Sequence, residues 1–480
     1  MDYLIDGTIA NAELGHTVAL SADGKRVAIG QKGVEATTPP MVTVYENDGN
    51  AWLPIGDPII GEANNDPHGF SIALSADGQT MALGLAHHDA LSENMGQLKV
   101  YTYVNESWSQ MGSTILGTQE EDLLGYAVAI SATGDRVAVG APDYDHSEME
   151  PDVGYTQIYE YDNGEWIQLG SDIIGDVPQE VSGRALSLSA DGLHLAIGSP
   201  TYGIYISPGV PGAVRLFEYI QGEWQQKGNT IHSFAESAVM GSAVALSADG
   251  NRVALSAPVS MSGGHVYVFQ YAQEDWQYIG GVTAAVNDYL YSTNFGTAIA
   301  LSGDGHRLVV GNSIVDVDLN APELGEGILY IYEYDGDTHW NEIGRIENED
   351  QEERTYFGGA IGLSADGTQL AVGARAKDND LAEDVGRVLI YSGVGTTSVQ
   401  EVKALEHRNL ILYPNPTQGP LFLAGEPIDY QAVQVTNHLG QLLQRQSTID
   451  QVDLSGLPTG LYFIALLTEK EMLIQPVLKE

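Results

Sequence analysis

The sequence contains no cysteine and few basic residues. Without cysteine it can form neither a disulfide framework nor a thiolate metal site, so redox chemistry says nothing about its compartment. Only 20 Lys and Arg residues stand against 65 Asp and Glu residues, and the resulting formal charge of −45 repels nucleic acid and anionic lipid surfaces. No apolar run reaches the length of a membrane span. Residues 1–7 lack the basic start and the apolar stretch of a signal peptide, so we expect any export signal to have been removed.

Helix-favouring runs are also scarce, whereas 56 glycines and 25 tyrosines indicate many short strands joined by tight turns. A turn reading Ser-Ala-Asp-Gly, or a close variant, recurs seven times at intervals of 54 to 62 residues. Its glycines are Gly24, Gly78, Gly134, Gly192, Gly250, Gly305 and Gly367. Because one unit of this size cannot bury its apolar face alone, neighbouring units must stack into an all-β array.

Each repeat holds four short apolar stretches, which predict four antiparallel strands that we call A to D. From the turn glycine to the small residue that ends strand B is six residues in every unit. In six units a tryptophan of strand D is followed four residues later by glycine, a regularity that favours packing between units over ligand binding. Only the segment between the end of strand B and the aromatic residue of strand C varies freely, from 13 to 21 residues. In a radial blade the B–C loops emerge beside the D–A links, so this face is the predicted binding side.

Three features together resemble the FG-GAP repeats of integrin-like β-propellers. They are the opening pairs Gly69-Phe70, Phe295-Gly296 and Phe357-Gly358, the closing triplet Gly140-Ala141-Pro142, and the Gly-x-Val-x-Val-Tyr strands. The triplet weakens to Gly-Ser-Pro, Ser-Ala-Pro and Gly-Ala-Arg in other units. The resemblance covers residues 1–397 and implies a seven-bladed β-propeller. Calcium-binding members carry several acids in the A–B turn, whereas only Asp23 is acidic in the first unit, so we expect no calcium in these turns.

A propeller must also close its ring, and two segments compete for this role. Residues 4–7 align by spacing with residues 114–117, the end of a strand D. The seventh unit lacks its own tryptophan, so its outer strand comes from the amino terminus, from residues 398–405, or from both.

Residues 410–480 follow a connector at residues 398–409 and have a different pattern. The segments Leu412-Tyr413-Pro414-Asn415-Pro416, Val435-Thr436-Asn437-His438-Leu439-Gly440 and Leu457-Pro458-Thr459-Gly460-Leu461-Tyr462-Phe463 resemble the carboxy-terminal sorting domain of the type IX secretion system. This resemblance implies export to the medium or the outer cell surface and contact with the secretion machinery. The alternating apolar pattern predicts a small β-sandwich with a last strand at residues 472–478.

Several B–C loops carry candidate functional residues. Tyr202 and Tyr205 lie among Pro and Gly residues, where rings can stack on sugars, contact a protein, or pack onto the blade. His87 and His88 have metal-ligand chemistry but no evident third ligand, which favours a solvated loop. Acidic side chains gather in two further loops and could hold calcium there; otherwise the two loops are simply exposed and acidic. The residues concerned are Asp143 and Asp145, with Tyr144 between them as a binding candidate, and Asp378, Asp380 and Asp384.

We find no nucleophile elbow, phosphate loop, zinc motif or outstanding pair of carboxylates, so no required cofactor is expected. The leading hypothesis is a secreted or surface-displayed, non-enzymatic protein that binds a glycan or a protein through the loop face. One alternative is a polysaccharide-acting enzyme that uses acids of the central channel. The other alternative is a structural subunit of an extracellular assembly.

Overall fold

The structure is a computed structural model in which the chain forms two compact units, Met1–Ser398 and Val399–Glu480. The residues described are 3–34, 38–61, 70–89, 92–147, 150–200, 212–233, 239–258, 264–283, 294–313, 327–337, 339–348, 355–378, 382–394, 411–413, 420–424, 432–437, 442–446, 452–458, 460–467 and 472–479. No helix in this part of the chain is long and apolar enough to cross a membrane.

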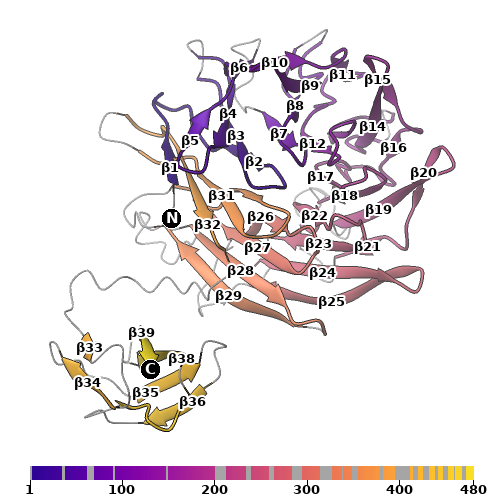
Figure 1. Ribbon diagram of the computed structural model, residues 1–480. Coiled ribbons are helices and arrows are strands. Elements are labelled where there is room, and N and C mark those ends of the chain that lie inside the picture. Colours follow the sequence, from indigo (N-terminus) through magenta and orange to yellow (C-terminus); the bar gives the residue numbers. More distant parts are fainter. Residues whose placement is uncertain are drawn as a thin grey trace, which may run out of the picture. The chain divides into compact units, whose positions relative to one another are not determined.

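The first unit is a seven-bladed β-propeller, as predicted, in which each blade is an antiparallel sheet (Figure 1). The strands of the first three blades follow in chain order from the inner to the outer edge. Blade 1 contains β2 (Thr17–Leu20), β3 (Arg26–Gln31), β4 (Met41–Asn47) and β5 (Trp52–Pro54). Blade 2 contains β7 (Ser71–Leu74), β8 (Thr80–Leu85), β9 (Gln97–Val104) and β10 (Ser107–Gln110). Blade 3 contains β12 (Ala127–Ile130), β13 (Arg136–Ala141), β14 (Tyr155–Asp162) and β15 (Glu165–Gln168).

The remaining blades repeat this order. Blade 4 contains β17 (Ala185–Leu188), β18 (His194–Ser199), β19 (Ala213–Ile220) and β20 (Glu223–Gln226). Blade 5 contains β22 (Val244–Leu246), β23 (Arg252–Ala257), β24 (His265–Ala272) and β25 (Asp275–Thr283). Blade 6 contains β26 (Phe295–Leu301), β27 (Arg307–Asn312), β28 (Ile328–Tyr334) and β29 (Trp340–Glu347). Blade 7 contains β30 (Ala360–Leu363), β31 (Gln369–Ala374), β32 (Arg387–Ser392) and the amino-terminal β1 (Tyr3–Asp6).

Strand β1 closes the ring. It pairs antiparallel with β32, with Ile5 opposite Val388, so the indigo amino terminus completes the orange sheet in Figure 1. The Nε atom of Arg387 also donates a hydrogen bond to Asp6 at 2.6 Å. The first of the two predicted closing segments therefore supplies the outer strand, whereas residues 398–405 lie outside the described residues.

Strand D is interrupted in the first four blades. Its short tail pairs again with strand C after a break that contains glycine. These tails are β6 (Ile59–Ile60), β11 (Ile115–Leu116), β16 (Ile173–Ile174) and β21 (Ile231–His232). At each break the glycine lies against the tryptophan of the next blade; a Cβ atom on Gly112 would stand only 2.8 Å from Cδ1 of Trp166. The recurring tryptophan–glycine spacing thus reflects inter-blade packing.

The break also exposes a backbone carbonyl to the tryptophan. The indole Nε1 of Trp166 donates to the Met111 carbonyl at 2.7 Å, and Trp108, Trp224 and Trp276 make the same bond to the preceding blade. In blade 5, β25 runs through without a break, and Nε1 of Trp340 in blade 6 has no hydrogen-bond partner among the described residues. Interruption of strand D therefore permits the inter-blade bond.

The A–B turns form a second inter-blade connection, around the axis of the propeller. In each A–B turn, the residue after the serine donates its backbone N–H to the backbone carbonyl of the equivalent residue in the next blade. Between blades 1 and 2 the donor is instead the N–H of Asp23. The counterparts are Ala22, Ala76, Ala132, Ala190, Ala248, Gly303 and Ala365. Within a turn, Asp23 accepts hydrogen bonds from the Ser21 hydroxyl and the Lys25 N–H. An insertion would break this ring, which explains the invariant A–B spacing.

The second unit contains two antiparallel sheets. One joins β33 (Ile411–Tyr413), β34 (Pro420–Ala424) and β37 (Val452–Asp453). The other has the order β36 (Leu442–Gln446), β35 (Ala432–Asn437), β38 (Gly460–Leu467) and β39 (Met472–Lys479). Val433, Val435, Val452 and Ile464 are buried. The predicted sandwich arrangement of these sheets stays a prediction.

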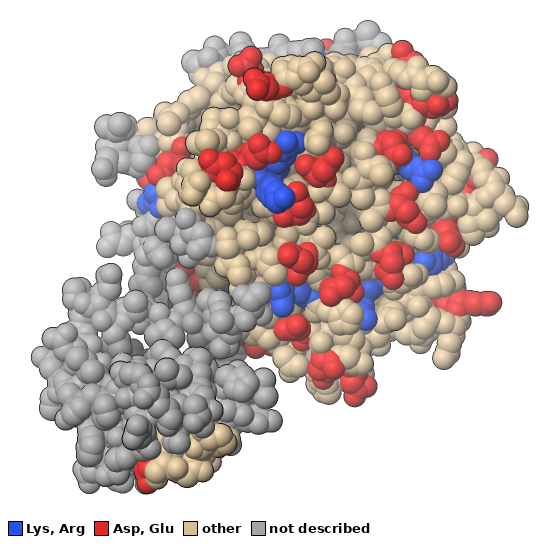
Figure 2. Space-filling model, viewed as in Figure 1, with Lys and Arg blue, Asp and Glu red and all other residues tan. Residues whose placement is uncertain are grey.

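Charge on the propeller is strongly unequal but locally balanced. On the face drawn in Figure 2, the few Lys and Arg side chains lie beside Asp and Glu side chains. Arg26 and Arg136, for example, contact Glu46 and Glu160 on the neighbouring strand at 2.8 and 2.7 Å. The charge of these two arginines is therefore balanced within their own blade.

Candidate functional site

The B–C loops and the D–A links lie on one face of the propeller, as predicted. Single parallel bridges join them: Gly96 of a B–C loop pairs with Leu124 of a D–A link, and Gly386 pairs with Leu14. We call this surface the loop face. The A–B turns and the C–D hairpins lie at the opposite strand ends.

Three B–C loops share one closing contact. In blades 2, 3 and 7 an aspartate carboxylate accepts a hydrogen bond from the N–H of a later loop residue in left-handed conformation. The pairs are Asp89 with Asn94, Asp145 with Asp152, and Asp378 with Asp384, at 2.9, 2.9 and 2.7 Å. The calcium candidates Asp145 and Asp378 therefore each use one carboxylate oxygen to close the loop. Asp380 lies outside the described residues.

The other candidates in these loops make local contacts. Nδ1 of His87 lies 3.2 Å from Oδ1 of Asn94, whose amide donates to Glu121 of the next D–A link. His88 is the neighbouring loop residue, and its carbonyl accepts the Gly96 N–H. The ring of Tyr144 packs edge-on against Tyr155 at 4.8 Å, which favours packing onto the blade for this residue. Tyr202 and Tyr205 lie outside the described residues.

Asp143 is the most perturbed acid of the third loop. Burial, and after it the charge of Asp152, raises the pKa of Asp143 to about 6. Its Oδ1 atom is buried and has no hydrogen-bond partner within the described part of the chain. In that part no three His, Asp or Glu side chains gather as metal ligands, and calcium at this loop stays a prediction.

We expect Asp143→Asn to stabilise the protein at neutral pH. The folded state holds the Asp143 proton to a higher pH than the unfolded state, so this residue lowers stability as pH rises from about 4 through 6. A shift of about two pKa units corresponds to roughly 3 kcal/mol, which partial exposure reduces to about 1–2 kcal/mol. Urea unfolding at pH 7.5 should show this gain, and a smaller one at pH 4.5.

The same variant tests the predicted calcium site. If calcium binds at Asp143, adding calcium should raise the melting temperature of the wild type but not that of Asp143→Asn. An equal gain from the substitution at both pH values would contradict the assigned role of the buried charge.

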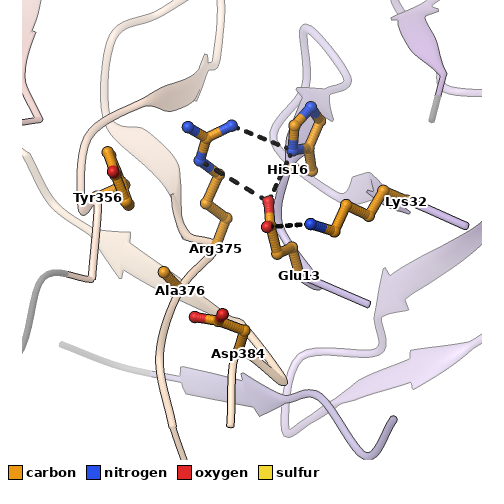
Figure 3. Close-up of a pocket in the computed structure, with 7 residues that line it drawn as sticks. All are labelled: Glu13, His16, Lys32, Tyr356, Arg375, Ala376 and Asp384. Atoms are coloured by element: carbon orange, nitrogen blue, oxygen red, sulfur yellow. Dashed lines mark hydrogen bonds and ion pairs between the residues drawn. The ribbon is translucent and has the colours of Figure 1, made fainter. Parts of the chain in front are cut away.

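A cavity of about 440 Å³ opens on the loop face where blades 7 and 1 meet (Figure 3). Glu13 and His16 come from the link that enters blade 1, and Lys32 from the segment after β3. Tyr356 comes from the link that enters blade 7, and Arg375 from the segment after β31. The full lining is Glu13, His16, Lys32, Tyr356, Arg375, Ala376 and Asp384.

Glu13 is the centre of the charged network in this cavity. Its carboxylate accepts a hydrogen bond from the Lys32 ammonium and lies 3.2 Å from Nδ1 of His16. Burial alone would raise the pKa of Glu13, but the hydrogen bonds from His16 and Lys32, followed by the charges of the neighbouring cations, lower it to about 2. Glu13 is therefore ionised at any physiological pH and fixes the two side chains around it.

Arg375 is held mainly by an aromatic ring. Its Cζ atom lies 4.6 Å from the centroid of Tyr356, which is the geometry of a cation–π contact. Its Nη1 is 3.4 Å from Nδ1 of His16, and its Nε is 3.9 Å from Glu13. Across the cavity, burial and then the charge of Glu13 raise the pKa of Asp384.

A smaller cavity of about 110 Å³ adjoins the first and shares His16, Tyr356 and Arg375 with it. It adds Thr297 and Ser313 of blade 6 to the lining. The combined surface thus crosses three blades and offers aromatic, basic and hydroxyl groups.

Apart from Asp384, none of these cavity residues is among the sequence candidates, although the sequence contains a signal for two of them. Lys32 and Arg375 occupy the same repeat position, two residues after the small residue that ends strand B. In blades 3, 4 and 5 this position holds proline. The chain has only 20 Lys and Arg residues. Two of them at one repeat position, in blades that lie side by side, are therefore a signal for this site.

The inner strands do not provide catalytic acids. The seven strands A, from β2 to β30, contain no Asp or Glu in the residues that the structure describes. The described inner strands therefore contribute no acids to the central channel named in the enzyme hypothesis.

The carboxy-terminal unit is recognised by comparison with known families. Residues 411–480 match the family model of the secretion system C-terminal sorting domain. The protein is therefore exported by the type IX secretion system and is secreted or displayed at the cell surface, which confirms the predicted localisation. No curated protein matches the sequence.

Solved structures similar to this chain are β-propellers of very different sequence. One, from Bacteroides uniformis, is provisionally described as a 6-phosphogluconolactonase; it has 12% identity and a TM-score of 0.50, and the match covers 77% of this chain and 95% of that chain. A protein of the same description from Bacteroides fragilis has 14% identity and a TM-score of 0.47, over 74% of this chain and 89% of its own. At such identities the likeness concerns the fold alone.

Proposed function

We propose that this protein is a secreted or cell-surface binding protein that holds a glycan or a protein partner on its loop face. The observation that carries the proposal is the cavity between blades 7 and 1, with its extension toward blade 6. It is concave, and it combines a tyrosine, an arginine, a lysine and hydroxyl groups from separate blades. Small-molecule sites typically combine a concave surface of roughly 300–1,000 Å³ with a few convergent polar groups.

Two further features support binding by this face. The loop face carries the length variation among the repeats, while the opposite face is fixed by the ring of backbone hydrogen bonds. Export by the sorting domain also places the propeller where it meets extracellular glycans and proteins. The FG-GAP resemblance of the repeats agrees with an adhesive role and belongs to the same proposal.

The test exchanges segments on the two faces. Replacing the B–C loops at 142–154, 200–212 and 313–327 by the short loop at 258–264 should weaken binding to cell-surface preparations at least tenfold. Periodate treatment of the preparations, which oxidises sugars, separates a glycan partner from a protein partner. Pull-down with the purified protein provides the measurement.

The matched control exchanges a C–D hairpin turn on the opposite face. Asn163 and Gly164 have nearly the same left-handed conformations as Gln221 and Gly222, with φ of 51° and 98° against 54° and 92°. Replacing the first pair by the second should leave binding unchanged. Equal binding by the loop exchange and the wild type would refute the proposed role of these three B–C loops, and equal binding by Arg375→Gln as well would refute the proposed role of the loop face.

A polysaccharide-acting enzyme is the second candidate, and one observation favours it. Glu13 and Asp384 lie in the same cavity, and their pKa values are moved in opposite directions, as in many acid–base pairs. However, both carboxylate oxygens of Glu13 are already engaged by Lys32 and His16. Release of reducing sugar from a polysaccharide panel, abolished in Asp384→Asn, would favour this candidate.

A further inference from the structure

Arg375 differs in how its charge is balanced from the three arginines of the propeller that hold a carboxylate most closely. Arg26, Arg136 and Arg387 each hold a carboxylate oxygen at 2.6 to 2.8 Å. The carboxylate described next to Arg375 is 3.9 Å away and faces its Nε atom. Its side chain is 38% exposed and lines both cavities. The two terminal nitrogens of Arg375 are thus largely available to a ligand in the cavity.

The surrounding residues fix this guanidinium in place. Tyr356 covers one face of the group at 4.6 Å, and His16 approaches Nη1 at 3.4 Å. A planar guanidinium held in this way presents a rigid fork of N–H donors, which matches the geometry of a carboxylate or sulfate. Little side-chain entropy is then lost when an anion binds.

A second cation lies beside this fork. Lys32 gives one of its three ammonium hydrogens to Glu13, and its side chain is 28% exposed. Thr297 and Ser313 line the adjoining cavity, and side chains with hydroxyl groups suit the hydroxyl groups of a sugar. The Thr297 hydroxyl donates to the Asn294 carbonyl, so toward a ligand it can act as an acceptor.

We propose that this cavity binds an acidic sugar, with the carboxylate or sulfate of the ligand on Arg375 and Lys32 and the sugar ring toward Thr297 and Ser313. The inference rests on the proposed function and assigns the chemical class of its ligand. Hydroxyl and cationic groups together recognise a charged sugar better than an apolar or a cationic ligand.

The charge of the whole chain further restricts the ligand. A formal charge of −45 repels densely charged polyanions, and Glu13 and Asp384 add two carboxylates to the cavity itself. Attraction is therefore local to the two cations. The ligand is a single acidic unit, or a glycan with widely spaced acidic units.

The test measures small probes by calorimetry on the full chain. D-glucuronate carries a carboxylate, glucose 6-sulfate a sulfate, and D-glucose neither. At least one of the two anions should bind, and D-glucose should bind at least tenfold more weakly. The anion that binds more tightly shows whether the acidic group of the ligand is a carboxylate or a sulfate. Because a charge-assisted hydrogen bond contributes about 1.5–3 kcal/mol, Arg375→Gln and Lys32→Gln should each weaken anion binding at least tenfold.

Arg345→Gln is the matched control, because Arg345 is 56% exposed on β29 and contacts only the exposed Glu342 at 3.4 Å among its described ion pairs. It should bind the anions as the wild type does, and Arg375→Lys should recover part of the affinity. Retained affinity in Arg375→Gln, equal binding of D-glucose, or no binding of either anion would overturn the proposal. If the loop exchange abolishes partner binding while Arg375→Gln binds normally, the proposed function stands and this assignment fails.

Discussion

Replacing Arg215 by alanine is expected to lower the free energy of unfolding of the propeller by about 3–5 kcal/mol, as is typical when one partner of a buried ion pair is removed. Arg215 lies on β19, and its side chain is only 4% exposed. Nearly all its polar partners belong to the link that joins blades 3 and 4. Its Nη2 atom donates to the Ile174 carbonyl and the Ser182 hydroxyl, both at 3.0 Å.

The charges that Arg215 balances differ in exposure. Asp176, at 3.0 Å, is 64% exposed and can be hydrated once the arginine is gone. Glu180, at 3.7 Å, is 6% exposed and cannot be hydrated without local opening. The Glu180 carboxylate also accepts hydrogen bonds from the backbone N–H groups of Asp176 and Val177. Movement of this side chain out into water would therefore disturb the turn. Most of the loss in Arg215→Ala therefore comes from the stranded Glu180 charge.

Three variants isolate this cause, with urea unfolding as the measurement. Arg215→Met with Glu180→Gln should be less destabilised than Arg215→Met alone, because the pair is then neutral. Arg345→Ala removes an exposed arginine and should cost less than about 1 kcal/mol. A loss below about 1 kcal/mol in Arg215→Ala would show that the link is not held by this ion pair.

The architecture could be predicted from the sequence because its determinants recur. Gly140 is the next-to-last residue of β13, and a Cβ atom there would stand 2.0 Å from the carbonyl oxygen of Gly183 in the next blade. The same constraint applies in other blades, so small residues return at a constant spacing. Repetition thus made both the strand boundaries and the variable face visible in one sequence.

The cavity could not be predicted in the same way, because it is built from departures from the repeat. Glu13 and Tyr356 adopt left-handed conformations in the D–A links, with φ of 50° and 52°. Leu123 and Val181 do the same in other blades, so the conformation belongs to the fold and only the side chains are specific. The two ends of the propeller sequence also meet here, and the sequence left open whether the amino terminus, residues 398–405 or both close the ring. The conspicuous loop acids instead close their own loops, as Asp145 and Asp378 do.

Ring closure by β1 leads to the second large prediction: Ile5→Glu should destabilise the propeller by more than about 3 kcal/mol. Ile5 is 7% exposed and packs in one cluster with Val388 and Ile390 of its own blade and Trp52 of blade 1. The substitution removes about 1.5–3 kcal/mol of apolar burial and adds the cost of placing an ionised carboxylate in that cluster. Because protonation reduces this second cost, the loss measured by urea unfolding should be larger at pH 8 than at pH 5.

The repeat provides the control for this variant. Ile60 occupies the next position of the corresponding strand tail in blade 1 but is 59% exposed, so Ile60→Glu should change stability by no more than about 0.5 kcal/mol. The contrast matters because strand pairing between β1 and β32 joins residues nearly 400 positions apart, as Ile5 and Val388 show. Breaking that pair opens blade 7 and separates the link that carries Glu13 from the B–C loop that carries Arg375, so Ile5→Glu should also abolish anion binding. If Ile5→Glu were as mild as Ile60→Glu, another segment would have to form the outer strand of blade 7.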